Sequence, residues 1–489
     1  MMSSQSAVFL GIDIGTQGVR TLAVNEHGQI LATADRTFPL DKQRQEQSPK
    51  QWWQMMSLCL LEMVEELKKQ VSPTYWRTVS VTSTSGTVLA LDQNDQPVSP
   101  ALMYSDSRPE QEAKMCREAV QQQPPDFGGY RSFNTSSALP EVLWYVRHHP
   151  ERAERIHRWV HATDYLIGRL SGVWGISDYT NVLKTGYDLL QHQWPDYIQS
   201  QLGLPLSWFP KVVAPGTPLG TITPEASAAT GLPVHLQVTA GMTDGCASQV
   251  ASGAIAPGEW NTTIGTTLVI KGVTRERVVD SRGRFYSHKH PQGHWMPGGA
   301  SNTGSDWVSK DYRHEELGEL TEKAEKLTPT SWLAYPLQGK GERFPFVASE
   351  AVGFEPDGLR PEERFAARME GVAYLERLAY ETAESLSGEQ VKAVYTAGGA
   401  SQNNTWLQIR SSVLNRLVIR MKNISGAMGA AILSASQSYY SGLQEAVSYL
   451  VTVEKQVEPH PQKHEVYQER YHQFLERLRE KGYLAGDPK

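Results

Sequence analysis

Apolar residues follow two patterns along the chain, short continuous runs and longer stretches of helical period. The run AVFLGIDIG at 7–15 ends in glycines and predicts a strand, and residues 20–38 predict two more strands joined by a turn. Residues 50–70 have helical spacing, and Pro73 ends the predicted helix. Alternating residues at 78–92 predict one further strand. The chain therefore opens with a strand, a glycine turn and a hairpin, followed by a helix and a strand.

The middle of the chain alternates helical stretches with turn-rich ones. Residues 104–120 and 139–149 predict helices, with a proline near the start of the first and another directly after the second. The Pro- and Gly-rich stretch 203–233 lacks a helical period, and we expect it to cover one edge of the first lobe. Residues 237–260 predict a strand, a turn and a helix.

The second half returns to the opening pattern. Residues 259–273 predict a strand, a glycine turn and a strand, as residues 7–24 do. A long helix is predicted at 361–388, because acidic residues fill its first turn and a glycine follows its end. Residues 391–421 predict a strand, a Gly-Gly turn, a helix and a strand, and the tail at 454–489 predicts a surface helix with a frayed end.

The length of 489 residues exceeds what one hydrophobic core usually fills and indicates two large domains or three ordinary ones. We place the boundary near residue 252, which gives an N-terminal lobe at 1–252 and a C-terminal lobe at 253–489. A hydrophobic content of 39% and a charged content of 20% supply ordinary globular cores.

The composition argues against several partners and compartments. The net charge is −6 and Lys and Arg form no dense run, so a nucleic-acid partner is not expected. The sequence has no span of about 18 apolar residues, so no membrane helix is expected. Three cysteines without a C-x-x-C pair predict neither a disulfide framework nor a zinc site, and the N-terminus lacks a basic leader and a cleavage site. We therefore expect a cytoplasmic protein. Its oligomeric state is not readable from the sequence, and a homodimer is left open.

A first motif for chemistry follows the opening strand. Gly15 and its neighbours form a tight turn in which backbone N–H groups can approach a phosphate, while Thr16 and Arg20 add a hydroxyl and a cation. Asp13 is a candidate ligand for Mg²⁺, through water. The alternative interpretation is an ordinary hairpin turn.

Two further turns suit a nucleotide. Gly265, Thr266 and Thr267 set a glycine among hydroxyl side chains, which suits a phosphate-binding hairpin or, alternatively, a plain threonine-rich strand. Gly398 and Gly399 follow a predicted strand, leaving room for a flat ligand against the backbone, or simply making a turn. Asn403 and Trp406 open the next helix, and Trp406 either stacks on the base or packs in the core.

Asp244 stands between Thr243 and Gly245, at the turn between an apolar strand and a small-residue helix. One interpretation makes it a helix N-cap. The other makes it the general base that takes the proton from the attacking sugar hydroxyl.

In this order, over residues 7–435, the four motifs resemble those of the FGGY carbohydrate kinases. The matching positions are Asp13, Gly15, Thr16 and Arg20 in the first phosphate motif, Gly265, Thr266 and Thr267 in the second, Gly398, Gly399 and Asn403 in the adenosine motif, and Asp244 as the catalytic aspartate. Gln17 and Gly18 stand where many members carry hydroxyl residues, and residues 424–431 lack the acid of a late family pattern. The resemblance implies an α/β fold of two ribonuclease-H-like lobes of the actin and hexokinase type, with mixed sheets flanked by helices and a central cleft for ATP and sugar.

The same resemblance locates the sugar in the first lobe. Residues 83–87 occupy the position where glycerol kinases carry Arg-Glu, and Thr84 and Ser85 can bond sugar hydroxyls there. Residues 104–108 resemble the family segment W-x-D-x-R, in which Asp106 binds the sugar or forms a structural pair with an arginine. Residues 177–188 resemble the branch that includes kinases related to D-ribulose kinase. A ketopentose is thus the expected substrate.

The predicted activity is transfer of the γ-phosphate of ATP, with Mg²⁺, to a primary hydroxyl of a small carbohydrate, D-ribulose first. D-xylulose or another polyol or sugar acid is the alternative substrate. An actin-like ATPase is a rival class that the candidate base Asp244 argues against. A non-catalytic sugar-binding module is a second rival, against which Asp13, Thr16 and Asp244 argue.

Overall fold

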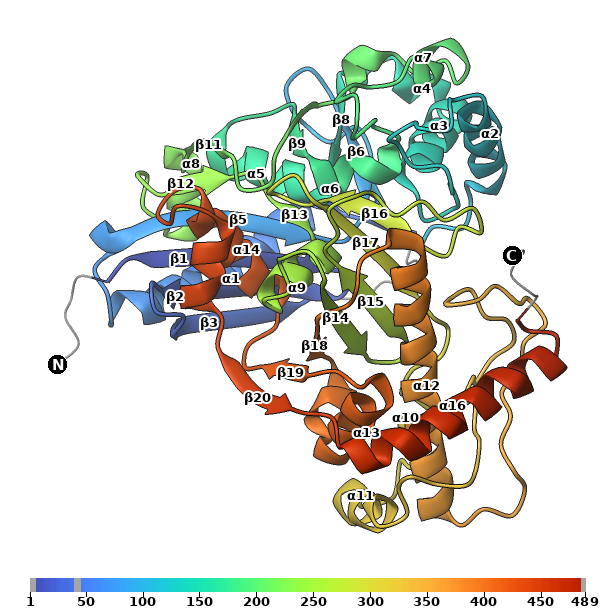
Figure 1. Cartoon of the computed structure of the whole chain (residues 1–489). Coiled ribbons are helices and arrows are strands. Elements are labelled where there is room, and N and C mark those ends of the chain that lie inside the picture. Colours follow the sequence, from blue (N-terminus) through green and yellow to red (C-terminus); the bar gives the residue numbers. More distant parts are fainter. Residues whose placement is uncertain (1–5, 39–44, 485–489) are drawn as a thin grey trace. The chain divides into compact units, whose positions relative to one another are not determined.

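The structure is a computed structural model that describes residues 6–38 and 45–484 of the chain (Figure 1). Its contacts divide the chain into two compact units. The first unit comprises Met1–Ala251 and Asn423–Val451, and the second comprises Ser252–Lys422 and Thr452–Lys489. Residues 423–451 therefore belong to the first unit, whereas the predicted boundary at residue 252 placed them in the C-terminal lobe.

The first unit is built on a mixed sheet in the order β11-β12-β5-β1-β2-β3, with β13 added beside β5. The strands are β1 (Val8–Gly15), β2 (Gly18–Asn25), β3 (Ile30–Thr37), β5 (Trp76–Ser83), β11 (Pro218–Thr221), β12 (Gln237–Thr239) and β13 (Met242–Thr243). β1, β2 and β3 form an antiparallel meander, whereas β5 runs parallel to β1 and to both β12 and β13.

Smaller sheets and helices complete the first unit. The remaining strands are β4 (Glu46–Gln47), β6 (Val88–Leu91), β7 (Ala101–Leu102), β8 (Arg158–His161), β9 (Ile176–Asp178) and β10 (Lys211–Val213). The helices are α1 (Pro49–Lys68), α2 (Glu110–Gln121), α3 (Ala138–His148), α4 (Pro150–Ala153), α5 (Ala162–Ser171), α6 (Tyr179–Val182), α7 (Tyr197–Ser200), α8 (Pro224–Thr230), α9 (Asp244–Ala251), α14 (Gly426–Ser436) and α15 (Leu443–Leu450).

The second unit is built on a mixed sheet in the order β16-β17-β15-β14-β18-β19-β20. The strands are β14 (Glu259–Ile264), β15 (Leu268–Gly272), β16 (Tyr286–Lys289), β17 (Trp295–Ala300), β18 (Ala393–Ala397), β19 (Val418–Met421) and β20 (Val453–Val457). The helices are α10 (Asp306–Asp311), α11 (Leu317–Glu325), α12 (Pro361–Ser387), α13 (Asn404–Leu414) and α16 (Pro461–Glu480).

The two sheets share one topology. In the first unit β1 pairs antiparallel with β2 and parallel with β5, and in the second unit β14 pairs antiparallel with β15 and parallel with β18. Each unit thus has a central strand, an antiparallel meander on one side and a parallel crossover strand on the other. This is the ribonuclease-H-like arrangement that the sequence resemblance implies.

Helix α14 explains why residues 423–451 belong to the first unit. All eleven of its residues are buried, and it packs against β1, β5 and α9. In Figure 1 this red helix lies beside the blue strands from the other end of the chain. The contact is close enough that a Cβ on Gly11 would lie 1.8 Å from the carbonyl oxygen of Ala427. Glycine is therefore required at this point of β1.

Several predicted elements need correction. Residues 78–92 form two strands in different sheets, β5 and β6, because the chain turns at Gly86 with φ +93. The predicted helix at 104–120 begins only at Glu110, because Asp106 accepts the backbone N–H of Arg108 and its guanidinium in a turn.

Further differences concern the stretch 203–233 and the tail. Strand β11 does form the sheet edge, as expected, and helix α8 follows it, which the sequence pattern missed. The tail begins with strand β20 before its helix α16, and the expected fraying at 485–489 lies outside the described residues. The three cysteines are buried free thiols. Within residues 6–38 and 45–484, no helix is both long and apolar enough to span a membrane.

Candidate active site

Three predicted segments meet at one edge of the first sheet. Ile14 of β1, Ser83 of β5 and Thr243 of β13 are aligned in register across the parallel strands. Because parallel strands end at the same edge, the residues that follow each of them emerge together. The first phosphate turn, the Thr84–Ser85 segment and Asp244 are therefore neighbours, although they come from distant parts of the sequence.

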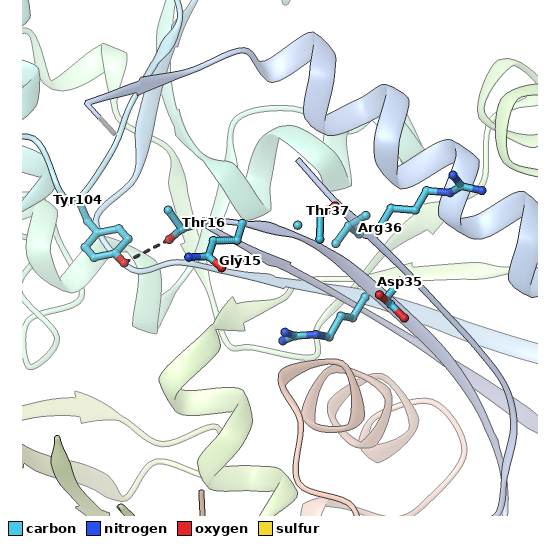
Figure 2. Close-up of a pocket in the computed structure, with 10 residues that line it drawn as sticks. Gly15, Thr16, Asp35, Arg36, Thr37 and Tyr104 are labelled. Atoms are coloured by element: carbon cyan, nitrogen blue, oxygen red, sulfur yellow. Dashed lines mark hydrogen bonds between the residues drawn. The ribbon is translucent and has the colours of Figure 1, made fainter. Parts of the chain in front are cut away.

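The first phosphate turn is a two-residue hairpin loop between β1 and β2, closed by the pair Gly15 and Gly18. A Cβ on Gly18 would lie 2.3 Å from the carbonyl oxygen of Arg36, so glycine here is required by the close approach of β3. Thr16 Oγ1 lies 3.2 Å from the hydroxyl of Tyr104 (Figure 2). The turn borders a cavity of about 390 Å³, which residues 35–37 of β3 also line.

Asp13 lies on β1 opposite Arg20 of β2, with 3.9 Å between Arg20 Nη1 and Asp13 Oδ2. The Arg20 side chain is 72% exposed. Burial, followed by the charge of Asp244, raises the pKa of Asp13 to about 6, and Arg20 opposes this shift. Asp13 and Asp244 are therefore close enough to interact electrostatically.

The residues around Asp13 fit a hydrated Mg²⁺. Asp13 Oδ1 is buried and has no hydrogen-bond partner among the described residues, and a carboxylate oxygen is a ligand that Mg²⁺ prefers. A Cβ on Gly426 would lie 2.7 Å from the Asp13 carboxyl carbon, so the start of α14 closes the other side of this carboxylate. Residues 424–431 lack the acid of the late family pattern and carry no predicted role, so this contact with Asp13 is a feature of the fold alone.

Asp244 is the first residue of α9 and is half-buried. Its Oδ1 accepts the backbone N–H of Gly245 at 2.7 Å. A Cβ on Gly241 would lie 1.9 Å from the carbonyl oxygen of Val81, so the chain that leads to Asp244 is pressed against β5. The position of Asp244 is thus fixed by the sheet.

The predicted sugar residues differ in their surroundings. Thr84 Oγ1 lies 2.9 Å from Thr87 Oγ1, and Ser85 Oγ is buried without a partner among the described residues. Both Asp106 oxygens accept hydrogen bonds from Arg108, and the Asp106 side chain is 0% exposed. Asp106 thus stabilises the turn at 104–108 through its pairing with Arg108. A direct contact with sugar would require the Asp106 oxygens to become accessible.

The second phosphate turn and the adenosine motif lie side by side in the second unit. Thr263 of β14 and Ala397 of β18 are in register, so the two glycine turns that follow leave the same edge of the sheet. A cavity of about 590 Å³ opens there. Its lining includes Gly265, Thr266, Ser305, Tyr312, Phe365, Gly399, Ala400, Asn403 and Trp406.

The two glycines of the adenosine motif do different things. Gly398 has φ +87, and a Cβ on it would lie 2.6 Å from the carbonyl oxygen of Ile264. Glycine is therefore required here by the backbone conformation and by the close approach of β14. A Cβ on Gly399 would meet nothing within 4 Å, so Gly399 leaves open space at the cavity wall. Asn403 caps α13 by accepting the N–H of Trp406 at 3.0 Å, and it donates to Thr321 at 3.1 Å.

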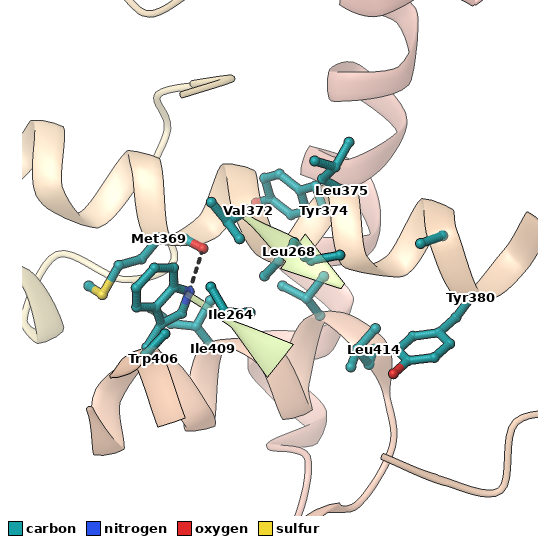
Figure 3. Packing of buried hydrophobic residues seen from close by; sticks show 14 of the residues in the cluster. Ile264, Leu268, Met369, Val372, Tyr374, Leu375, Tyr380, Trp406, Ile409 and Leu414 are labelled. Carbon is teal, nitrogen blue, oxygen red and sulfur yellow. Dashed lines mark hydrogen bonds between the residues drawn. The ribbon is translucent and has the colours of Figure 1, made fainter. Parts of the chain in front are cut away.

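Trp406 belongs to the hydrophobic core of the second unit (Figure 3) and is also one of the residues that line the cavity. Its indole N–H donates to the carbonyl oxygen of Met369 at 2.9 Å, and the residue is only 2% exposed. Most of the Trp406 side chain therefore packs in the core, which was one of its two predicted roles. Stacking of its small exposed part on a base stays a prediction.

Sequence reasoning missed the residues that hold the second turn. A Cβ on Gly304 would lie 2.6 Å from the Thr267 Cα, which shows how closely residues 304–305 press against the turn. Glu342 is 3% exposed and organises the preceding residues. Its carboxylate accepts hydrogen bonds from Ser301 Oγ, Asn302 N, Thr303 Oγ1, Tyr335 Oη and Arg343 N. No motif in the sequence signals this long-range hub.

Comparison with known proteins identifies the family. The N-terminal domain model of the FGGY family of carbohydrate kinases matches residues 8–251, and the C-terminal domain model matches residues 260–438. The chain belongs to the FGGY family of carbohydrate kinases. It is an ATP-dependent sugar kinase with the two-domain α/β fold of actin and hexokinase type.

Relatives across this family align along nearly the whole chain. A xylulose kinase of Bacillus subtilis is 28% identical over 463 residues, covering 90% of this chain and 91% of the relative. A gluconokinase of Bacillus licheniformis is 24% identical over 460 residues, covering 88% and 87%. The crystal structure of a xylulose kinase from Rhodospirillum rubrum superposes with a TM-score of 0.83 at 24% identity, covering 96% of this chain and 98% of that one.

Proposed function

We propose that this FGGY kinase phosphorylates the primary hydroxyl at C5 of a ketopentose, with D-xylulose and D-ribulose as the candidate substrates. The relative with 28% identity is named a xylulose kinase, and residues 177–188 resemble the D-ribulose kinase branch. The two sugars are epimers at C3 and share the hydroxyl that would be phosphorylated. The xylulose kinase relative and the resemblance of residues 177–188 thus both support a ketopentose substrate.

One observation carries the proposal, namely the register of β1, β5 and β13. It brings the first phosphate turn, the hydroxyl-bearing residues Thr84 and Ser85, and the carboxylate of Asp244 to one edge of the sheet. Transfer of a phosphoryl group to an alcohol needs three components. These are a phosphate-binding turn, hydroxyl partners for the sugar and a proton acceptor.

Asp244 is the proposed general base. Its carboxylate takes the proton of the sugar hydroxyl as the hydroxyl oxygen forms its bond to the γ-phosphorus, and the bond from that phosphorus to the bridging oxygen breaks to release ADP. The half-buried position keeps the carboxylate accessible while the sheet holds its backbone. Most of the rate enhancement would then come from positioning and from charge.

The nucleotide would occupy the cavity of the second unit. Gly265, Thr266 and Thr267 would contact the phosphates, and the open wall at Gly399 would accept the adenine, beside Asn403 and the accessible edge of Trp406. In the first unit, Asp13, Gly15, Thr16 and Arg20 form the first phosphate motif. Mg²⁺, with Asp13 as its protein ligand, would neutralise phosphate charge during transfer.

A substrate panel tests the proposal. ATP consumption and sugar phosphate are measured with D-xylulose, D-ribulose, glycerol and gluconate, and without any sugar. We expect the highest kcat/KM with one of the two ketopentoses. A best substrate among glycerol and gluconate would reject the ketopentose assignment, and ATP turnover that ignores all sugars would favour an ATPase.

A further inference from the structure

Two threonine side chains hold the backbone that leads into Asp244. Thr180 Oγ1 accepts the backbone N–H of Thr243 at 2.9 Å, and Thr82 Oγ1 donates to the carbonyl oxygen of Met242 at 2.8 Å. Both threonines are 0% exposed, so water does not compete for either bond. β13 consists of only Met242 and Thr243, so these side-chain bonds add to its short pairing with β5.

Thr180 is itself held in a fixed direction. It is the second residue of α6, whose N-cap is Asp178. Asp178 Oδ1 accepts both the backbone N–H of Thr180 at 2.8 Å and its hydroxyl at 2.6 Å. Since the hydroxyl proton is committed to Asp178, the remaining lone pairs of Thr180 Oγ1 are acceptors, and one of them meets the N–H of Thr243.

The bond from Thr180 reaches the backbone N–H of Thr243, the residue immediately before Asp244. A rotation of the Thr243 backbone would change the direction in which the carboxylate of Asp244 projects. On its other side α9 is packed closely, because a Cβ on Gly429 of α14 would lie 2.0 Å from the carbonyl oxygen of Ala247. Asp244 thus lies between a packed helix and a short strand that is bonded to Thr180 as well as paired with β5.

We propose that Thr180 is a positioning residue, which directs the carboxylate of Asp244 toward the reacting hydroxyl through its hydrogen bond to the N–H of Thr243. The inference rests on the proposed function of Asp244 as general base. The Thr180 side chain is fully buried, and its hydroxyl is bonded to Asp178 and to the N–H of Thr243. Its contribution is confined to the orientation of Asp244, and displacements of about 1 Å in a reacting group can cost about 100-fold in rate.

The test compares Thr180→Val with Thr180→Ser. Valine keeps the branched shape but cannot accept the Thr243 N–H, whereas serine keeps the hydroxyl. We expect Thr180→Val to lower kcat by about 10-fold to 100-fold, with the Kd values for ATP and for the sugar changed less than about threefold. Thr180→Ser should retain at least about half of the wild-type kcat.

Thr78→Val is the matched control. Thr78 is also a buried threonine of the first unit, and its hydroxyl lies 2.8 Å from Ser434 Oγ. Its replacement should lower the thermal midpoint as Thr180→Val does while leaving kcat near wild type. If kcat falls equally in both variants, general loss of stability explains the effect and the proposal is wrong.

The double variant Asp244→Asn with Thr180→Val tests whether Thr180 affects kcat through Asp244. If Thr180 acts through Asp244, Thr180→Val has no further effect on kcat once Asp244 is replaced. Additive losses would overturn the proposal.

The single variants separate the two hypotheses. If Asp244→Asn alone keeps its activity, the proposed base is wrong. If Asp244→Asn is inactive and Thr180→Val has normal activity, only the role proposed for Thr180 is wrong. Should Thr180→Val not fold, Thr180→Ala is measured instead, and failure of both to fold would assign Thr180 to the fold rather than to the base.

Discussion

Ser305 donates two hydrogen bonds to the carbonyl oxygen of Gly265, from its backbone N–H at 2.8 Å and from its hydroxyl at 2.7 Å. Gly265 opens the second phosphate turn, and both residues border the cavity proposed for the nucleotide. The turn is therefore held from outside by a residue that no sequence motif marks. Its geometry depends on this pair, since the Gly265 carbonyl can accept both bonds at once.

Replacement of Ser305 by alanine removes one of these bonds and leaves the backbone bond in place. We expect the Kd for ATP to rise about fivefold, since one hydrogen bond contributes about 1 kcal/mol. The Kd for the sugar should not change. Calorimetry with each ligand measures both values, and Ser287→Ala is the control, because that buried hydroxyl of the same unit bonds the Val278 carbonyl. Equal ATP affinity in wild type and Ser305→Ala would show that the hydroxyl does not shape the turn.

Gly399→Leu tests the proposed nucleotide cavity by filling it. A Cβ at Gly399 meets no neighbouring atom within 4 Å, so we expect the variant to fold with a nearly unchanged thermal midpoint. The leucine would occupy the cavity wall, and we expect ATP binding to weaken by at least about tenfold, which corresponds to about 1.4 kcal/mol. Gly339→Leu is the matched control, because Gly339 is equally unobstructed and lies outside the residues that line this cavity. Normal ATP affinity in Gly399→Leu would exclude the cavity as the nucleotide site.

The sequence predicted the local parts of both units because each part carries its own signal. A short apolar run that ends in glycine identified β1, and a repeat of its strand, glycine turn and strand pattern identified β14. The acidic first turn and final glycine identified α12. The neighbourhood of Asp13 and Asp244 came from the family resemblance. It has a physical basis in the parallel register of β1, β5 and β13, which a single sequence does not display.

The parts that escaped prediction are contacts between distant residues. The return of residues 423–451 to the first unit depends on α14, whose small and mostly apolar residues suit the core of either unit in the sequence pattern. Gly18 looked like a departure from the phosphate motif, yet it is explained by the nearness of Arg36 in the folded hairpin. Glu342 and Thr180 likewise act on residues far along the chain, so no local spacing reveals them.

Asp244→Asn separates the two interpretations of Asp244. Asparagine keeps the side-chain shape and can still accept the N–H of Gly245, which Asp244 Oδ1 binds at 2.7 Å. A helix-capping role would therefore survive the change. A general base would not, and we expect kcat for sugar phosphorylation to fall by about 10² to 10⁴ with ATP binding retained. A purified variant with more than about a tenth of the wild-type kcat would contradict the catalytic role.

Glu370 in the core of the second unit predicts a pH-dependent stability. It is 0% exposed, and burial raises its pKa from 4.5 to about 7, opposed by hydrogen bonds from Thr330 and Tyr467. Between these two pKa values the folded state holds a proton that the unfolded state has released. Stability from this group is thus fully present below about pH 4.5 and is lost as the pH rises through about 7, by about 3 kcal/mol in total.

Glu370→Gln should remove this dependence while preserving the packing. Thr330 Oγ1 can donate to the carbonyl oxygen of Trp332 at 3.1 Å, which frees it to accept from a protonated Glu370 or from the glutamine amide. Urea unfolding at pH 5 and pH 8 measures the difference. We expect the wild type to lose more stability than Glu370→Gln between these values, and the exposed Glu465→Gln on α16 to follow the wild type. Parallel pH profiles for wild type and Glu370→Gln would mean that Glu370 stays ionised in the folded protein, in which case its hydrogen bonds outweigh the cost of burial.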